Sequence, residues 1–246
     1  MKGEYTWEYE APASLPWQEE KKKPVRDCFK GDSLALGWCF WGRPYEKYWA
    51  LGEDGLTIRC VRQALAEKLR PMSMEAVRAE ENFAPFVARR RLQMHCRFAC
   101  RLRFLPKGAE TADIAVVQAM NHQFQLRLAQ RDGQIFLQLV QYPSDYALPP
   151  YIPGFSAVTA CTVLAERPWD GDEIVLEMEL CENDYRFRCG KDEGALTEFA
   201  RADGFVLNPE KVGCMVGEML GLFASGNGTE SGSTAVFAWA EYEDYT

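Results

Sequence analysis

The segment LQMHCRFACRLRF, residues 92–104, alternates apolar and polar side chains over thirteen positions. Successive side chains of a β-strand point to opposite faces of its sheet, whereas those of a helix repeat every 3.6 residues. The period of two therefore predicts one long strand with a buried face and a polar face. Its apolar members are Leu92, Met94, Cys96, Phe98, Cys100, Leu102 and Phe104.

The same period continues along the chain. Residues 123–128 and 135–139 alternate on either side of the turn former Asp132-Gly133, which predicts a β-hairpin. Residues 174–180 and 185–189 predict a second hairpin that turns near Asn183, and residues 235–242 predict a last strand. Only residues 61–69 and 74–81 have a helical pattern. Many half-buried strands and little helix favour an all-β fold in which two antiparallel sheets pack face to face.

Length and charge narrow the class of protein. The 246 residues fit one sandwich domain, which we place at residues 27–246, after a polar, proline-containing extension or linker at residues 1–26. The 28 Lys and Arg residues are outnumbered by 36 Asp and Glu residues, for a net charge of -8. Such a charge repels phosphate and anionic lipid, so we expect neither a nucleic-acid nor a membrane partner.

Cysteine usage and the N-terminus indicate the compartment. The nine cysteines form no C-x-x-C pair and no compact group with the two histidines, so we expect no zinc site, no other metal and no cofactor. Several cysteines lie within apolar alternation, where a free thiol behaves as a small hydrophobic group. No apolar run suits a signal peptide or a membrane span. These features predict a cytoplasmic location.

Four segments of the sequence resemble those of one known family. GLFASGNG at residues 221–228 and AVFAWAEYE at residues 235–243 resemble the G-L-x-A-x-G-N-G and A-x-F-D-W-F-x-Y-E motifs of the C-terminal domain of glycoside hydrolase family 43 β-xylosidases. FVARRR at residues 86–91 and DCFKGDSL at residues 27–34, with Trp38 following, resemble its L-x-x-R-R-Q and D-D-F-x-x-x-x-L-x-x-x-W segments. The resemblance covers residues 27–246 and implies a concanavalin A-like β-sandwich, or jelly roll.

The resemblance also implies what this sequence lacks. Family members hydrolyse glycosides with a pair of carboxylates on a five-bladed propeller, and the 26 residues before Asp27 are too few to form one. We therefore expect no catalytic residue. Ala238 replaces the acidic residue of F-D-W-F, which argues against a structural calcium ion. The family loop that abuts the catalytic pocket matches residues 215–222, so Arg89, Arg90 and Met215 are candidates for docking to a partner.

Two groups of side chains are candidates for carbohydrate binding. The polar positions Gln93, His95, Arg97, Gln123, Gln125 and Arg127 can donate to or accept from sugar hydroxyls. On neighbouring strands of a concave face they would form one groove, and the arginines could pair with uronic acids. The competing interpretation is a solvated sheet face. Trp41 and Tyr48 flank a Gly-Arg-Pro loop and could stack on sugar rings, or could pack at a sandwich edge.

Three functions follow as hypotheses. The first is a non-catalytic accessory domain that binds xylan-type oligosaccharides or docks to a glycoside hydrolase catalytic subunit. The alternative is a glycoside hydrolase in its own right, with carboxylates on the concave sheet face. The third is a structural domain that forms homo-oligomers.

Overall fold

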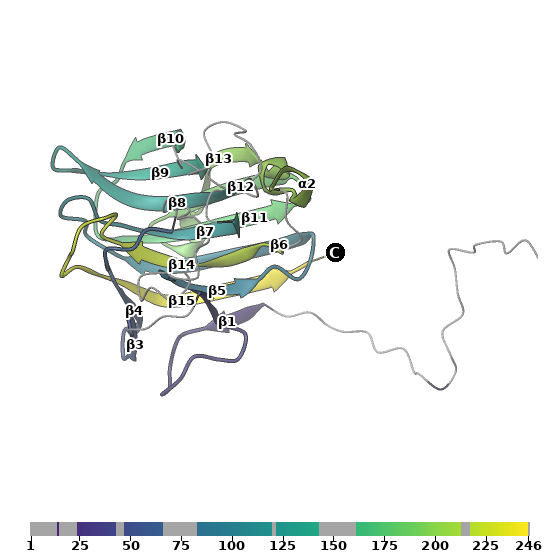
Figure 1. The fold of residues 1–246 in the computed structure, drawn as a ribbon, viewed down its shortest axis with the longest axis horizontal. Helices are drawn as coiled ribbons and strands as arrows, with labels where there is room; N and C mark the ends of the chain where they lie inside the picture. The colour runs from purple at the N-terminus through teal and green to yellow at the C-terminus, as the bar shows by residue number, and fades with distance from the viewer. Residues whose placement is uncertain are drawn as a thin grey trace, which may run out of the picture.

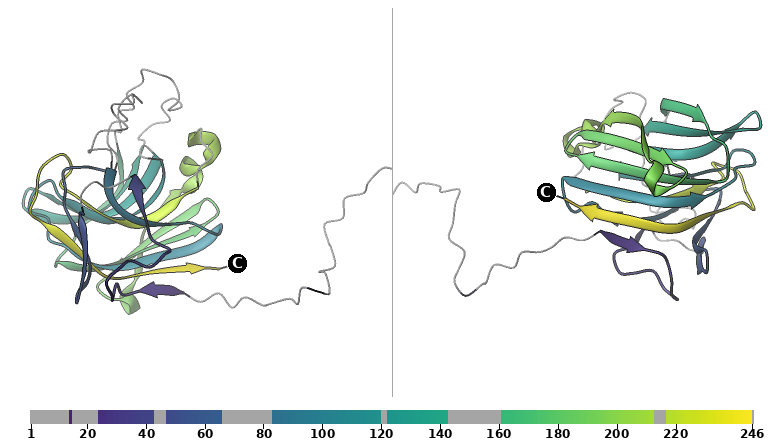
Figure 2. Two further views of the ribbon diagram at one scale, coloured as in Figure 1. Left: turned by 60° about the horizontal axis from the view of Figure 1, so that its bottom comes forward. Right: turned by 180° about the vertical axis from the view of Figure 1, so that it is seen from behind.

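The computed structural model describes residues 14, 24–42, 47–65, 83–119, 122–142, 161–212 and 217–245. Within these residues the chain forms two β-sheets, one of eight strands and one of seven, whose strands pair in antiparallel fashion (Figure 1). The left view of Figure 2 shows the two layers stacked face to face. The predicted all-β sandwich is therefore confirmed.

The sheets interleave early and late parts of the chain. Sheet A has the order β13 (Thr197–Asp203), β12 (Asp184–Gly190), β11 (Glu173–Cys181), β6 (His95–Arg103), β15 (Thr234–Asp244), β4 (Gly55–Arg59) and β3 (Trp49–Gly52), with β1 (Val25–Asp27) also paired to β15. Sheet B has the order β10 (Thr162–Pro168), β9 (Gln134–Tyr142), β8 (His122–Arg131), β7 (Thr111–Ala119), β14 (Met219–Ser225), β5 (Phe83–Arg90) and β2 (Cys39–Gly42). Short helical turns are η1 (Glu193–Ala195), η2 (Gly204–Leu207) and α2 (Pro209–Val212).

The main core lies between the sheets, and it is formed largely by the apolar side chains of the predicted alternating segments. Cys96, Phe98, Cys100 and Leu102 of β6 are fully buried, as are the apolar positions of β8 and β11. Phe124 of sheet B packs between the rings of Tyr185 and Phe187 of sheet A, with ring centroids 5.9 and 6.0 Å away. The buried cysteines are free thiols, and burial raises the pKa of Cys96 to about 11.

Both predicted hairpins are present. The β8–β9 turn contains Asp132 and Gly133 with φ of 52° and 80°, a left-handed conformation that Asp and Gly tolerate. The β11–β12 turn places Glu182 at φ 53°, next to Asn183. Figure 2 shows β11 and β12 side by side in its right-hand view, which looks at sheet A from behind.

Two predictions about local structure need correction. Strand β6 begins at His95, and Leu92 and Met94 are 65% and 62% exposed instead of lying on the buried face. The guanidinium of Arg91 donates to the carbonyl oxygens of Gln93 and Met94, which fixes a turn ahead of the strand. Residues 61–65 are not helical, because Val61 forms a β-bridge with Ser225. Residues 66–82, with the remaining helical predictions, lie outside the described residues.

The N-terminal end of the described chain is attached to sheet A. Strand β1 begins at Val25, two residues before the predicted domain start, and its Arg26 stacks 4.1 Å above the ring of Trp239 on β15. Most of the predicted linker at residues 1–26 lies outside the described residues. In the part of the chain that is described, no helix is long and apolar enough to cross a membrane.

Candidate functional site

The six polar residues predicted to form one groove lie on two surfaces. Strand β6 is in sheet A and β8 is in sheet B, so Gln93, His95 and Arg97 are separated from the other three by the core. The reason is topological, because β7 pairs with β8 and β14 in sheet B after the chain has left β6 in sheet A. Alternation revealed which side chains point outward but not to which sheet each strand belongs.

Arg97 lies at the centre of an ion-pair network on the outer face of sheet A. Its guanidinium lies 3.1 Å from both Glu177 and Glu243, and it also donates to Glu241. Arg188 and Arg26 add a second cation to Glu177 and Glu241, at 2.8 and 2.7 Å. The donors of Arg97 are thus directed at carboxylates of this chain, so a structural role replaces the predicted pairing with a uronic acid.

Gln123, Gln125 and Arg127 lie on the outer face of sheet B. Gln123 and Gln125 are 0% and 3% exposed, and the amide of Gln125 donates to that of Gln123 at 2.8 Å. Arg127 Nε donates to Gln138 at 2.9 Å. Because the two glutamines are buried, this face offers neither the predicted open groove nor the competing solvated face.

Asp113 lies on the same outer face of sheet B, where a buried carboxylate is unexpected. It lies opposite Arg127 on β8 and Phe223 on β14, and it is fully buried. Neither carboxylate oxygen has a hydrogen-bond partner among the described residues. Burial raises the pKa of Asp113 well above its ordinary value, against the opposing charge of Arg127.

The two aromatic candidates pack against other parts of the fold. Tyr48 is 2% exposed, and its hydroxyl donates to the carbonyl oxygen of Phe86 at 3.2 Å. Trp41 packs on the apolar cluster that Phe86 and Phe223 form on the outer face of sheet B. Edge packing, the alternative interpretation, therefore describes both residues. Trp38 also packs against the core, and its Nε1 donates to Asp27 at 2.8 Å.

The three docking candidates have different positions. Arg89 points between the sheets, where its guanidinium lies 4.6 Å above the ring of Tyr242. Arg90 is exposed at the end of β5. Met215 lies outside the described residues.

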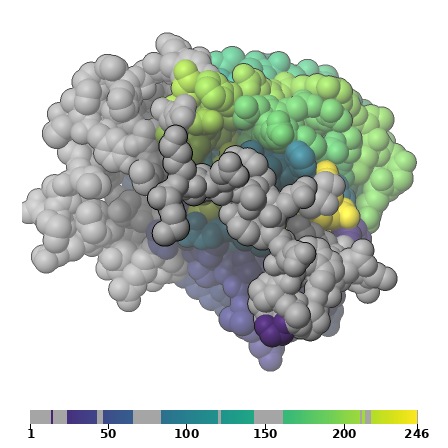
Figure 3. All heavy atoms as spheres, turned by 90° about the vertical axis from the view of Figure 1, so that its right-hand side faces the viewer, coloured from purple at the N-terminus to yellow at the C-terminus, as the bar shows by residue number. Residues whose placement is uncertain are grey.

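A pocket of about 320 Å³ opens at one end of the sandwich. Figure 1 shows this end on the right, beside α2, and Figure 3 views the molecule from that side. The β5–β6 turn, the β11–β12 turn, η2, α2 and the start of β14 surround it. Its lining includes Arg91, Leu92, Gln93, Met94, Gln118, Glu182, Asn183, Tyr185, Asn208 and Glu218.

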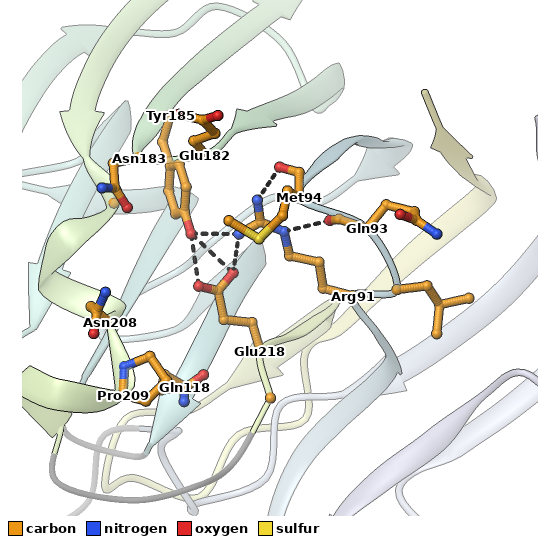
Figure 4. A pocket seen from close by; sticks show the side chains of 13 residues that line it. Arg91, Gln93, Met94, Gln118, Glu182, Asn183, Tyr185, Asn208, Pro209 and Glu218 are labelled. Carbon is orange, nitrogen blue, oxygen red and sulfur yellow. Dashed lines mark hydrogen bonds and ion pairs between the residues drawn. The ribbon is translucent and has the colours of Figure 1, made fainter. Parts of the chain in front are cut away.

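Three of these side chains form a closed polar cluster in the pocket wall (Figure 4). Arg91 Nη1 lies 2.7 Å from Glu218 Oε2 and 2.8 Å from the Tyr185 hydroxyl, which lies 2.8 Å from Glu218 Oε1. Burial, followed by the charge of Glu218, raises the pKa of Tyr185, so its hydroxyl keeps its proton. Of the predicted residues that the structure describes, only Gln93 lines this pocket. The sequence contained one further indication of this pocket, because Arg91 directly follows the predicted docking residues Arg89 and Arg90.

Two carboxylates, those of Glu182 and Glu218, are among the described residues that line the pocket. Glu218 already accepts from Arg91 and Tyr185, which makes it a fixed hydrogen-bond acceptor. Ala238 of β15, which stands where the family motif has an acidic residue, offers no side-chain oxygen to a cation. Within the described residues, no group of three or more His, Cys, Asp or Glu side chains could hold a metal ion.

Comparisons with known proteins agree with the sequence motifs. The family described as the β-xylosidase C-terminal concanavalin A-like domain matches residues 26–243. A non-reducing end α-L-arabinofuranosidase, BoGH43B of Bacteroides ovatus, is 25% identical over 232 residues, which cover 93% of this chain and 39% of that enzyme.

Solved structures show the same fold. The GH43B protein from a Bacteroides ovatus xyloglucan locus has a TM-score of 0.72 at 22% identity, over 94% of this chain and 41% of its own. A xylan β-1,4-xylosidase from Bacillus halodurans has a TM-score of 0.73 at 16% identity, over 96% of this chain and 42% of its own. The chain thus spans about two fifths of the length of these relatives.

Proposed function

This chain belongs to the family of β-xylosidase C-terminal concanavalin A-like domains, and from that membership we propose that it is a non-catalytic accessory module that docks onto a glycoside hydrolase catalytic module. The family match spans nearly the whole chain, whereas the chain spans only 39–42% of the three related proteins. In those relatives the same fold is therefore only part of the chain, and more than half of the chain lies outside it. A surface adapted to such a neighbour is the feature that the proposal requires.

The observation that carries the proposal is an exposed apolar pair beside a charged side chain. Leu92 and Met94 are 65% and 62% exposed in the β5–β6 turn, two and four residues after the exposed Arg90. We call these three residues the docking patch. Apolar side chains and arginine are enriched at the centres of protein interfaces. The patch adjoins Gly217 and Glu218, within the segment that resembles the family loop beside the catalytic pocket.

The test is co-expression with the catalytic module of a family 43 glycoside hydrolase from the same organism. We expect a complex in size-exclusion chromatography with light scattering. Replacing Leu92 and Met94 by Asp should weaken it by about 1,000-fold, because each lost interface side chain is worth about 2 kcal/mol. Leu105→Asp is the matched control, because Leu105 is 53% exposed just beyond the opposite end of β6.

Two outcomes would count against docking. One is equal binding by the wild-type chain and the Leu92/Met94 variant. The other is the absence of a complex between two folded proteins, in which case light scattering also shows whether the chain instead associates with itself. The hydrolase alternative is assayed on nitrophenyl xyloside and arabinofuranoside with the chain alone. Turnover that Glu218→Gln abolishes would replace the proposal with catalysis.

A further inference from the structure

We propose that the pocket at the end of the sandwich binds a neutral saccharide of one or two sugar units. This inference goes beyond docking and needs no partner protein, although the choice of xylan-type sugars as probes rests on the proposed function. The pocket volume of about 320 Å³ is at the lower end of the range for small-molecule sites, roughly 300–1,000 Å³, and suits a ligand of that size.

The polar groups of the pocket match sugar hydroxyls, which both donate and accept. Gln93 and Asn183 are exposed at its rim, and neither side-chain amide has a hydrogen bond to the rest of the described chain. Each amide offers two donors and an acceptor oxygen. Glu218 adds carboxylate lone pairs deeper in the wall. Figure 4 shows Asn183 beside the Tyr185 ring and Glu218 below the ring.

The fixed charges select a neutral ligand. The guanidinium of Arg91 donates through Nε to Gln93, through Nη2 to Met94 and through Nη1 to Glu218 and Tyr185, so its charge is matched within the wall. Glu182 is a second carboxylate of the lining. Two carboxylates against one guanidinium repel an anionic sugar, which disfavours the uronic acids that free arginines would have favoured.

The wall is held rigid before a ligand arrives. Gly204 packs on the Tyr185 ring so closely that a Cβ at this position would lie 2.3 Å from a ring atom. The Gly204 N–H donates to the carbonyl oxygen of Asn183 at 2.8 Å, which ties η2 to the β11–β12 turn. On its other side the Tyr185 ring packs against Phe124. Groups fixed in this way lose little conformational entropy on binding.

The experiment is a calorimetric titration of the full chain with xylobiose, arabinobiose and glucose, and with glucuronate as the anionic counterpart of glucose. We expect saturable binding of at least one neutral sugar. The glucuronate should bind roughly tenfold more weakly, with a difference that shrinks as salt screens the carboxylates. Asn183→Ala and Gln93→Ala should each weaken the neutral sugar roughly threefold to tenfold, the equivalent of one hydrogen bond. Gln134→Ala, an exposed amide in the β8–β9 turn, is the matched control.

Glu218→Gln tests whether charge or shape determines the preference of the pocket for a neutral sugar. It keeps the size of the side chain but leaves Arg91 without its counter-ion, so the glucuronate should gain affinity relative to the neutral sugar. The inference is overturned if no neutral sugar binds to the folded chain, or if binding is unchanged in Asn183→Ala and Gln93→Ala. Arg90→Glu lies outside the pocket lining and tests docking separately, so failure of one proposal leaves the other standing.

Discussion

Replacing Arg97 by alanine is expected to lower the free energy of unfolding by about 3 kcal/mol. The variant leaves Glu177 and Glu241, whose side chains are only 4% and 10% exposed, with one arginine each instead of two. Removing one member of a buried ion pair costs far more than the pair contributes, because the remaining charge stays desolvated. Denaturant unfolding at pH 7 measures the loss.

The matched control is Arg101→Ala, on the same strand and the same face. Arg101 lies 3.7 Å from Glu173, and the two side chains are 32% and 47% exposed. Exposed pairs contribute 0–1 kcal/mol, so this variant should unfold almost as the wild type does. Equal losses of stability in the two variants would show that the ion-pair network around Arg97 contributes no more than an exposed ion pair.

Lowering the pH should reduce the difference in the free energy of unfolding between the wild type and Arg97→Ala. Burial alone would raise the pKa of Glu241, but hydrogen bonds from Arg26 and Arg97 outweigh it and hold that pKa below its ordinary value. A carboxylate with a lowered native pKa stabilises the fold above its unfolded pKa and loses this contribution as the pH falls. The stability gap measured at pH 7 should therefore be larger than the gap measured near pH 4.

Replacing Asp113 by asparagine is expected to raise the free energy of unfolding by about 2 kcal/mol at pH 7, because folding the wild-type chain makes this buried carboxyl bind a proton that the unfolded carboxylate has released, and this costs more than burying a neutral amide. Asp113 is fully buried and both of its oxygens are without a hydrogen-bond partner among the described residues. Asparagine has nearly the same shape and no charge to desolvate. Thermal unfolding should show a midpoint about 4–8 °C higher.

The stability gained by Asp113→Asn should become smaller as the pH falls. The native pKa of Asp113 lies above the unfolded value, so the native chain binds a proton that the unfolded chain has released. Wild-type stability therefore rises as the pH falls through that native pKa, and the advantage of Asp113→Asn shrinks. Asp170→Asn, an exposed position before β11, is the control and should change nothing. A less stable Asp113→Asn variant at pH 7 would contradict the account.

The candidate site was predictable only in part. Gln93, a polar position of the alternation, lies in the pocket, and Arg90, which the family resemblance made a docking candidate, lies beside it. Gln123 and Gln125 were chosen from the same kind of alternation, and Tyr48 as an aromatic side chain beside a loop, but all three are buried. A period of two shows which side chains leave the core, but it does not show whether another part of the chain covers them.

The sequence by itself determined the fold. Strand alternation, the two hairpin turns and the motifs at residues 221–228 and 235–243 predicted a sandwich of the correct family, because each depends on contacts between near neighbours in the chain. Only the tertiary structure decided that β6 and β8 belong to different sheets and that Arg91, Tyr185 and Glu218 meet at one pocket. These residues are separated by up to 127 positions, and such distances close only when the two sheets pack.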